Sequence, residues 1–183
     1  MHFEYETSRM KLSVLNESYA DCALRFYLGG RQAFEPVEPA KNAGFYTVEF
    51  QRANLQSELN AFINGTYMRY FWFAKEKPAQ IIGTASFSGI IRGAYRSCQL
   101  GYKLLPEFQK QGYALEAVSR LITAVFEEER LHRIEAFTLP DNISSISLLT
   151  RLGFEFEGVA RSVIMLRDGY ADHNRYVMIN PKD

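Results

Sequence analysis

The chain has 183 residues, of which 47% are hydrophobic and 14% aromatic, so it is long enough and apolar enough to bury a substantial core. Lysine plus arginine and aspartate plus glutamate number 21 each, which gives a formal net charge of zero. This balance excludes the strong positive field by which proteins bind nucleic acids without sequence specificity. We expect a single domain over residues 1–183 that makes no direct contact with nucleic acid.

The cysteines and the first residues of the chain indicate where in the cell the protein is expected. Cys22 and Cys98 form neither a CxxC motif nor a cluster with histidine, so the sequence predicts no metal site. The first residues do not resemble a signal peptide, and the apolar run at residues 67–74 has only the length of a strand. We expect a cytoplasmic protein that does not associate with membranes, with Cys98 as a buried apolar residue rather than a nucleophile.

In the first half of the chain, hydrophobic periodicity predicts one strand, two helices and three further strands. The first strand covers residues 10–15, and the helices cover residues 17–27 and 48–63. Strands are then expected at residues 68–75, 80–90 and 96–104, separated by the turns Lys77-Pro78 and Arg92-Gly93. These three strands should form an antiparallel meander.

The second half alternates helices and strands. After Gly112, apolar residues recur at helical spacing from Ala114 to Phe126, and a strand is expected at residues 133–139. A second helix opens near Asn142 and closes at Gly153, and two final strands at residues 156–166 and 175–179 join around residues 168–169. The pattern predicts an α/β (α+β) fold.

The turn before the first of these two helices is the most informative segment. It reads Gln109-Lys110-Gln111-Gly112-Tyr113-Ala114 and leads from a strand into a helix, an arrangement that presents free backbone N–H groups to a phosphate. Gly112 lets the backbone approach a ligand closely. The alternative is an ordinary helix start in which Lys110 is a solvated surface lysine. A second motif about 30 residues downstream favours a cofactor site.

Together the two motifs resemble the GNAT superfamily of acetyl-coenzyme A-dependent N-acetyltransferases. The resemblance rests on Gly101-Tyr102, on Gln109-x-x-Gly112-x-Ala114 and on Asn142-x-x-Ser145-x-x-Leu148-x-x-Arg151-x-Gly153-Phe154. Residues 7–12 and 168–173 also look like one branch, the ribosomal-protein N-terminal acetyltransferases that modify alanine or serine termini. The resemblance covers almost the whole chain and implies a GNAT-type mixed, mostly antiparallel sheet of about six to seven strands flanked by helices.

The resemblance also implies acetyl-coenzyme A as cofactor and direct attack of an amine on its thioester. The backbone between Gln109 and Ala114 would bind the pyrophosphate, and the backbone of Leu104 and Leu105 would hold the pantetheine arm and supply an oxyanion donor. The cofactor-binding residues implied in this way are Leu104, Leu105, Gln109, Lys110, Gln111, Gly112, Tyr113, Ala114 and Asn142.

Two residues of the second motif have competing interpretations. Asn142 either contacts the pantetheine arm, as the resemblance implies, or only caps the helix that it opens. Ser145 resembles the family's catalytic hydrogen-bond donor to the departing sulfur, and the alternative is a polar residue of the first turn. A hydroxyl suffices for this task, because a thiolate whose conjugate acid has a pKa of about 8.5 needs a donor rather than a strong acid.

The general base does not match the resemblance. A carboxylate is expected just before Gly101-Tyr102 or on the strand after Gly153-Phe154, where this chain has Gln99 and Ile164. Glu157, Asp172 and His173 remain as candidates, followed by Glu135. Without a dedicated base an α-amine is favoured, since with a pKa of about 7.8 it is roughly a tenth neutral at pH 7, whereas a lysine amine with a pKa near 10.4 is almost wholly protonated.

Three functions remain open at this point. The chain is a protein N-terminal acetyltransferase, an acetyltransferase of small amines such as polyamines or antimicrobials, or a non-catalytic module that binds acetyl-coenzyme A. The acceptor would contact the connection around Phe34-Glu35-Pro36, because long irregular connections often carry binding residues. A homodimer is compatible with the sequence.

Overall fold

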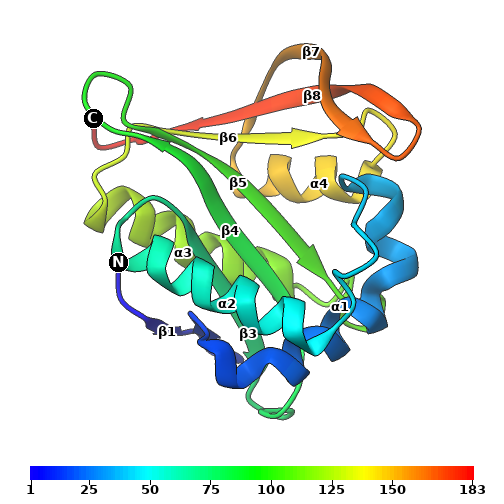
Figure 1. Cartoon of the computed structure of the whole chain (residues 1–183). Helices are drawn as coiled ribbons and strands as arrows, with labels where there is room; N and C mark the ends of the chain where they lie inside the picture. Colours follow the sequence, from blue (N-terminus) through cyan, green and yellow to red (C-terminus); the bar gives the residue numbers. More distant parts are fainter.

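An eight-stranded sheet in the order β1-β2-β3-β4-β5-β6-β8-β7 forms the centre of the computed structural model, which describes residues 1–183 (Figure 1). Only β5 and β6 pair in parallel. The predicted α/β (α+β) class with a mostly antiparallel sheet is confirmed, although the sheet has eight strands rather than six to seven. The strands are β1 (Glu4–Glu6), β2 (Met10–Ser13), β3 (Met68–Ala74), β4 (Ile81–Ile91), β5 (Ser97–Leu104), β6 (Arg133–Thr138), β7 (Glu155–Leu166) and β8 (Gly169–Ile179).

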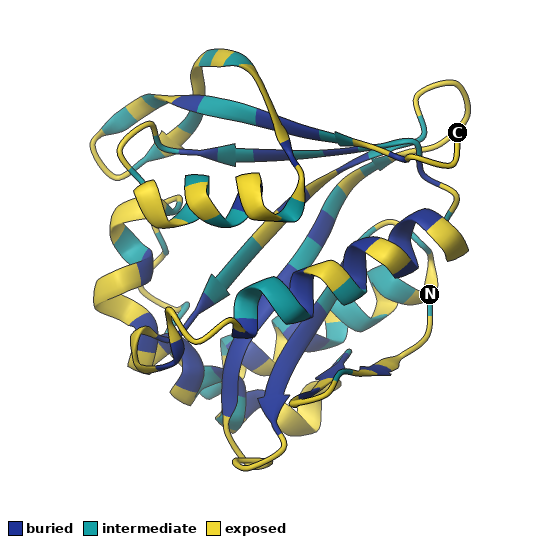
Figure 2. Ribbon diagram, turned by 180° about the vertical axis from the view of Figure 1, so that it is seen from behind, coloured by how far each residue is buried: buried dark blue, intermediate teal, exposed yellow.

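Four α-helices cover the two faces of this sheet. Helices α1 and α2 lie on one face and α3 and α4 on the other, as the views from the front and from behind show (Figures 1 and 2). The inner side of α3 is fully buried, with Ala117, Val118, Leu121 and Val125 at 0% exposure, which matches the periodicity of the sequence. The helices are α1 (Ala20–Phe34), α2 (Val48–Ile63), α3 (Tyr113–Glu128) and α4 (Ile143–Leu152).

Most predicted boundaries agree with the structure within three residues, and three larger differences remain. The first helix runs on to Phe34 instead of ending at residue 27, because the Phe34 ring is buried and packs on Phe26 with 5.4 Å between ring centroids. Strand β8 begins at Gly169 instead of Arg175, since it pairs with β7 along its whole length. Strand β1 has only three residues and was not predicted, because so short a segment shows no alternation.

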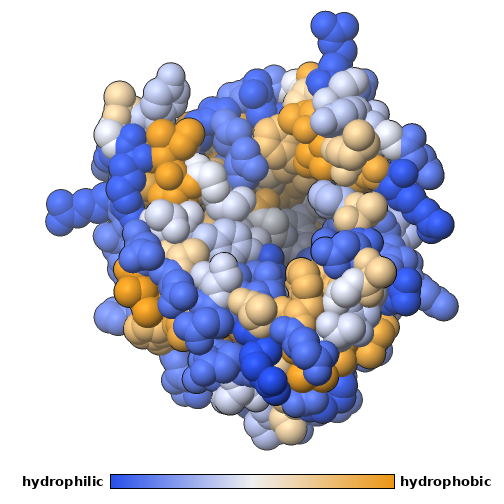
Figure 3. Space-filling view, in the orientation of Figure 1, coloured by the Kyte–Doolittle hydropathy of each residue, from blue (hydrophilic) through white to orange (hydrophobic).

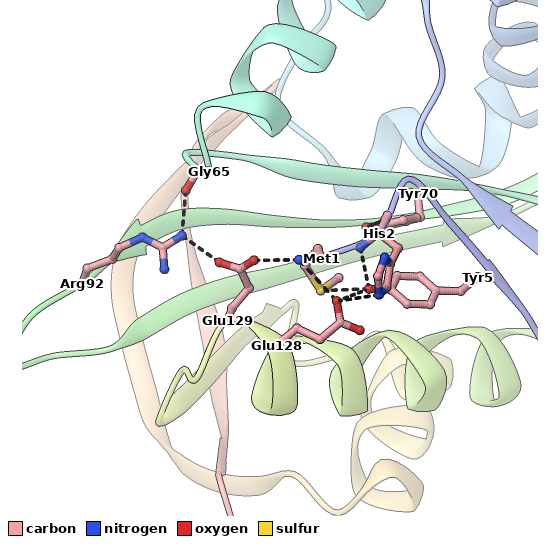
Figure 4. Close-up of polar contacts among 8 residues, drawn as sticks. All are labelled: Met1, His2, Tyr5, Gly65, Tyr70, Arg92, Glu128 and Glu129. Atoms are coloured by element: carbon pink, nitrogen blue, oxygen red, sulfur yellow. Dashed lines mark hydrogen bonds and ion pairs between the residues drawn. The ribbon is translucent and has the colours of Figure 1, made fainter.

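Polar contacts connect the end of α3 to β1 and to the turn after β4 (Figure 4). Arg92 donates to the Glu129 carboxylate at 2.7 Å, and the Tyr5 hydroxyl donates to Glu128 at 2.7 Å. The amino group of Met1 also donates to Glu129 at 3.0 Å. These contacts hold the C-terminal end of α3, which lies opposite the site described below. None of the four helices combines the length and the apolar character needed to cross a membrane.

Candidate active site

The site lies where two parallel strands separate. Strands β5 and β6 are paired from Ser97↔Arg133 to Leu100↔Ala136, and beyond Leu100 strand β5 stays beside β4 while β6 stays beside β8. The two strands therefore diverge as the arms of a V (Figure 1). The surface of the molecule is hollowed at this place (Figure 3), so the exposed backbone edges of β5 and β6 line a cleft.

A loop with free backbone donors follows β5 at the wide end of the V. None of the six backbone N–H groups from Lys110 to Leu115 donates a hydrogen bond within the protein, whereas that of Gln109 donates to the Pro106 carbonyl at 3.1 Å. Lys110 (φ +58°) and Gly112 (φ +83°) both have left-handed backbone conformations, and no side chain caps α3. Successive free N–H groups at a helix N-terminus form a concave site suited to phosphate oxygens.

Arg9, which precedes β2, holds this loop from outside. Its guanidinium donates to the Gln111 carbonyl at 2.9 Å, pairs with Glu116 at 2.7 Å and lies 4.3 Å from the centroid of the Tyr113 ring. Partial burial would raise the pKa of Glu116, but hydrogen bonds from Thr7, Arg9 and Ser8 outweigh it and bring the pKa down to about 2. No role for Arg9 follows from the sequence, because only the fold places β2 beside α3.

The side chains of the loop hold its shape rather than point toward a ligand. The amide of Gln109 donates to the Leu104 carbonyl at 3.3 Å, and that of Gln111 donates to the Glu107 carbonyl at 2.7 Å. Tyr113 is buried and its hydroxyl donates to Glu76 at 3.0 Å, while Ala114 is half-buried against the core. Lys110 is exposed and pairs with no carboxylate, so it is the loop's free positive charge.

The two strand-end residues differ in what their backbone offers. The N–H of Leu105 donates to the Ile82 carbonyl at 2.9 Å and is therefore already part of the sheet. The expectation that Leu105 could supply an oxyanion donor is wrong for this reason. Because N–H directions alternate along a strand, the N–H of Leu104 points away from β4 and into the V. Of the two strand-end residues, Leu104 is therefore the one whose N–H is directed into the V.

Helix α4 brings a serine to the opposite side of the V, beside a tyrosine of β5. The hydroxyls of Ser145 and Tyr102 are 2.8 Å apart, and the Tyr102 hydroxyl also reaches the Ser145 carbonyl at 3.3 Å. Burial raises the pKa of Tyr102 to about 12, against the lowering effect of its contact with Ser145, so the phenol stays protonated. The sequence indicates Tyr102 only as part of a motif and does not reveal it as the partner of Ser145.

Asn142 caps α4, as its position in the sequence allowed. Its side-chain oxygen accepts hydrogen bonds from the Ser145 N–H at 3.1 Å and from the Ser144 hydroxyl at 3.0 Å. Its amide nitrogen donates to no group of the protein and is available to a ligand in the V. The oxygen of Asn142 therefore caps α4, and its amide nitrogen remains free to contact a cofactor, so the two roles that the sequence left open are compatible.

The candidates for a general base are spread over the C-terminal strands. Glu157 accepts two hydrogen bonds from Arg133, at 2.9 and 2.6 Å, and these bonds lower its pKa. Asp172 accepts from the Ser162 N–H at 2.7 Å in a bulge of β7, and His173 is buried with its Nδ1 3.1 Å from the Ala171 carbonyl. Each of these three side chains has a structural partner.

The two positions where a carboxylate was expected lie far apart. Gln99 is exposed on β5 next to the point where the strands diverge, whereas Ile164 is half-buried in the β7–β8 hairpin, opposite Ala171. Ile164 is therefore remote from Gln99 along the sheet. Only the Gln99 position is adjacent to the V.

The connection between α1 and α2 covers the cleft from the side. Glu38 pairs with Lys103 of β5 at 2.5 Å and with Lys41 at 3.0 Å. Burial lowers the pKa of Lys103 to about 8, although Glu38 opposes this; despite its own burial, Glu38 has a pKa below its usual range because of the two lysines. Phe34 itself ends α1 and is buried, so the expected irregular acceptor segment begins at Glu35.

Comparison with known proteins gives a consistent assignment. The acetyltransferase (GNAT) domain family matches residues 30–155. The [ribosomal protein uS5]-alanine N-acetyltransferase of Escherichia coli (strain K12) is 29% identical over 175 residues, which cover 96% of this chain and 90% of that protein.

Two solved structures share the fold. The ribosomal-protein-S5-alanine acetyltransferase of Vibrio fischeri has a TM-score of 0.92 at 27% identity and covers 98% of each chain. The microcin C7 self-immunity acetyltransferase MccE, solved with acetyl-CoA and AMP, has a TM-score of 0.83 at 22% identity and covers 94% of this chain and 93% of its own. With the V between β5 and β6 and the free N–H groups before α3, these matches show that the chain belongs to the GNAT family of acetyltransferases and is an N-acetyltransferase.

Proposed function

We propose that this chain transfers the acetyl group of acetyl-coenzyme A to the N-terminal α-amine of a protein, most specifically a ribosomal protein with an alanine or serine terminus. The observation that carries the cofactor assignment is the run of six unpaired N–H groups from Lys110 to Leu115 at the wide end of the V. A pyrophosphate bound there would direct the pantetheine arm along the free edge of β5, past Leu104 and toward Ser145.

The reaction is direct transfer, and each task has a group beside the V. The N–H of Leu104 stabilises the developing oxyanion, and the Ser145 hydroxyl, held by Tyr102, donates to the departing sulfur. The fixed positions of the loop and of α4 hold the thioester in place for attack. The amide nitrogen of Asn142 would donate to a carbonyl of the pantetheine arm.

The choice of an N-terminal acceptor rests on the names of the similar proteins and on amine chemistry. Two of the proteins compared above are named for alanine acetylation of a ribosomal protein. An α-amine with a pKa of about 7.8 loses its proton far more readily than a lysine amine with a pKa near 10.4. Because the net charge is zero, binding to a ribosomal protein would depend on a local surface rather than on the overall field.

A small amine is the second candidate acceptor, because MccE shares the fold and was solved with AMP beside acetyl-CoA. The test is to incubate the purified protein with acetyl-coenzyme A and a panel of alanine-, serine- and methionine-initiated peptides, polyamines and aminoacyl nucleotides while the released thiol is measured. Turnover of alanine or serine peptides supports the proposal. Turnover of small amines alone would show that the chain is a small-amine acetyltransferase. Binding of acetyl-coenzyme A without turnover would show that it is a non-catalytic module.

A further inference from the structure

The floor of the cleft carries one carboxylate at the point where the strands separate. Tyr102 of β5 contacts α4, so Gln99 and Lys103, which have the opposite orientation along the strand, face α1 and α2; Lys103 indeed contacts Glu38 there. Glu135 of β6 is the register partner of Gln99 and shares its face. A carboxylate therefore lies at the level of Gln99, one strand away.

Glu135 has one oxygen engaged and one open. Its Oε1 accepts a hydrogen bond from Nε of Arg133 at 2.7 Å, while its Oε2 accepts none within the protein. The side chain is 22% exposed, so a water molecule or an amine can reach it. One register pair further on, after Leu100 and Ala136, the two strands part.

The other carboxylates on this side of the sheet either have partners or lie away from the V. Glu157 is held by Arg133 and Arg175, and Glu38 is held by two lysines. Glu58 also has one unpartnered oxygen, Oε2, but it lies between α2 and β3, where its Oε1 accepts from Asn54 at 3.0 Å and pairs with Arg69 at 3.2 Å. Glu135 alone combines a position next to the V with an unpartnered oxygen.

We propose that Glu135 is the catalytic base that takes the proton from the attacking amine, directly or through one water molecule. This inference rests on the proposed function and deepens it. The substrate ammonium gives a proton to the Glu135 carboxylate, and the freed nitrogen lone pair forms the C–N bond. The C–S bond breaks with its electron pair on sulfur, which gains a proton from the Ser145 hydroxyl. The amide nitrogen then loses its second surplus proton, which restores Ser145, and Glu135 releases its proton to solvent.

The charged surroundings of Glu135 suit this task. Arg133 of β6 contacts it directly, Glu157 of β7 shares that arginine, Arg175 of β8 pairs with Glu157, and Lys103 of β5 faces the same cleft. The arginine holds the carboxylate in place through the bond from its Nε to Oε1. Proton transfer to a carboxylate becomes easier as the pKa of the amine falls, so this base favours an α-amine over a lysine amine.

The test compares Glu135→Gln with Glu157→Gln, which also removes a carboxylate from Arg133 but lies outside the cleft floor. At saturating acetyl-coenzyme A and peptide, kcat of the parent should be level from about pH 6 upward. In Glu135→Gln it should be about 100-fold lower at pH 7 and should climb about tenfold per pH unit until the pKa of the amine, about 7.8, is reached. Glu157→Gln should keep the parent profile, and Glu135→Asp should regain part of the rate.

Calorimetry should give the same affinity for acetyl-coenzyme A in all variants, which separates proton transfer from folding and cofactor binding. The proposal is overturned if Glu135→Gln keeps the level profile, or if both glutamine variants lose the same rate with unchanged pH dependence. If the parent acetylates a small amine and no peptide, the proposed acceptor is wrong, and the same profiles recorded with that amine still decide the role of Glu135.

Discussion

At the scale of single residues, the hydroxyl pair of Ser145 and Tyr102 links α4 to β5 at the edge of the V. The phenol fixes the serine hydroxyl within 2.8 Å, and its raised pKa of about 12 keeps the proton available for a chain of donors toward sulfur. A donor that acts on sulfur becomes important only as negative charge develops there. Its removal should therefore affect the chemical step more than cofactor binding.

Ser145→Ala should lower kcat by roughly 10- to 1,000-fold with little change in the affinity for acetyl-coenzyme A. Tyr102→Phe, which leaves the serine in place but frees its hydroxyl, should cause a smaller loss, of about tenfold. Steady-state rates and calorimetry on both variants provide the comparison. Parent-like kcat in Ser145→Ala would return this serine to a structural role in the first turn of α4.

The proposed binding of phosphate by the loop before α3 depends on Gly112. This residue has φ +83°, and a β-carbon at this position would lie 3.3 Å from Nη2 of Arg9. A side chain would therefore strain the backbone of the loop and displace the Arg9 guanidinium. Gly112→Val should raise the dissociation constant of acetyl-coenzyme A by tenfold or more. Gly93→Val is the matched control, because Gly93 has φ +72° but lies in the β4–β5 turn, where an added β-carbon would meet no atom within 4 Å.

Calorimetry on the two folded glycine variants decides this point. The control should bind the cofactor as the parent does, since the β4–β5 turn lies at the other end of β5 from the loop. Unchanged affinity in Gly112→Val would remove the loop from the cofactor site.

At the scale of elements, the contact between β2 and α3 couples the phosphate loop to the sheet. Burial alone would raise the pKa of Glu116, but hydrogen bonds from Thr7, Arg9 and Ser8 outweigh it and give a pKa of about 2, below the ordinary value of about 4.5. A carboxyl whose pKa is depressed in the folded state stabilises that state above its unfolded pKa. This stabilisation is lost as the pH falls from about 4.5 through 2.

Glu116→Gln should therefore lower the melting temperature at pH 7 by roughly 2–4 °C, which corresponds to ~1 kcal/mol for a partly exposed ion pair. The difference between parent and variant should shrink as the pH is lowered toward 2. Melting curves recorded by circular dichroism at pH 7, 5, 3.5 and 2.5 measure it. A difference that is independent of pH would show that packing, and not the charge of Glu116, connects the two elements.

The elements also show what a sequence can and cannot predict. Helices α2 and α3 have strong local signals, and the structure confirms the range of α2 at both ends, Val48 and Ile63. The end of α1 at Phe34 and the start of β8 at Gly169 depend on contacts with distant segments, which local periodicity does not contain. For the same reason the sequence predicts the phosphate loop but not the roles of Arg9 and Tyr102, whose partners are 107 and 43 residues away.

Glu135 shows the same limit of a linear pattern. From the sequence alone it comes after Glu157, Asp172 and His173 as a candidate base, because nothing in the order of residues reveals which carboxylates are held by arginines or by backbone groups. The register between β5 and β6 brings it beside Gln99. Only the pairing of two strands that are separated by α3 in the sequence could show this.

At the scale of the whole molecule, the separation of β5 and β6 divides the chemistry between the two faces of the sheet. In the proposed reaction, the loop before α3 together with Asn142 and Ser145 of α4 would bind the cofactor on one face, and the cleft between α1–α2 and β6 would receive the acceptor on the other (Figures 1 and 3). The amine and the thioester would thus approach the same gap from opposite sides. The acceptor side carries the proposed base, Glu135, together with the ion pair of Lys103 and Glu38.

The nature of the acceptor amine is the central claim that follows from this arrangement, and two peptides of one sequence test it most directly. One peptide has a free alanine N-terminus and an acetylated lysine, and the other has a blocked N-terminus and a free lysine. We predict that at pH 7 the first is acetylated at least a hundredfold faster in kcat/KM, because its amine has the lower pKa and the proposed base, Glu135, is a carboxylate. Faster acetylation of the lysine peptide would contradict this claim and remove the chain from the N-terminal class.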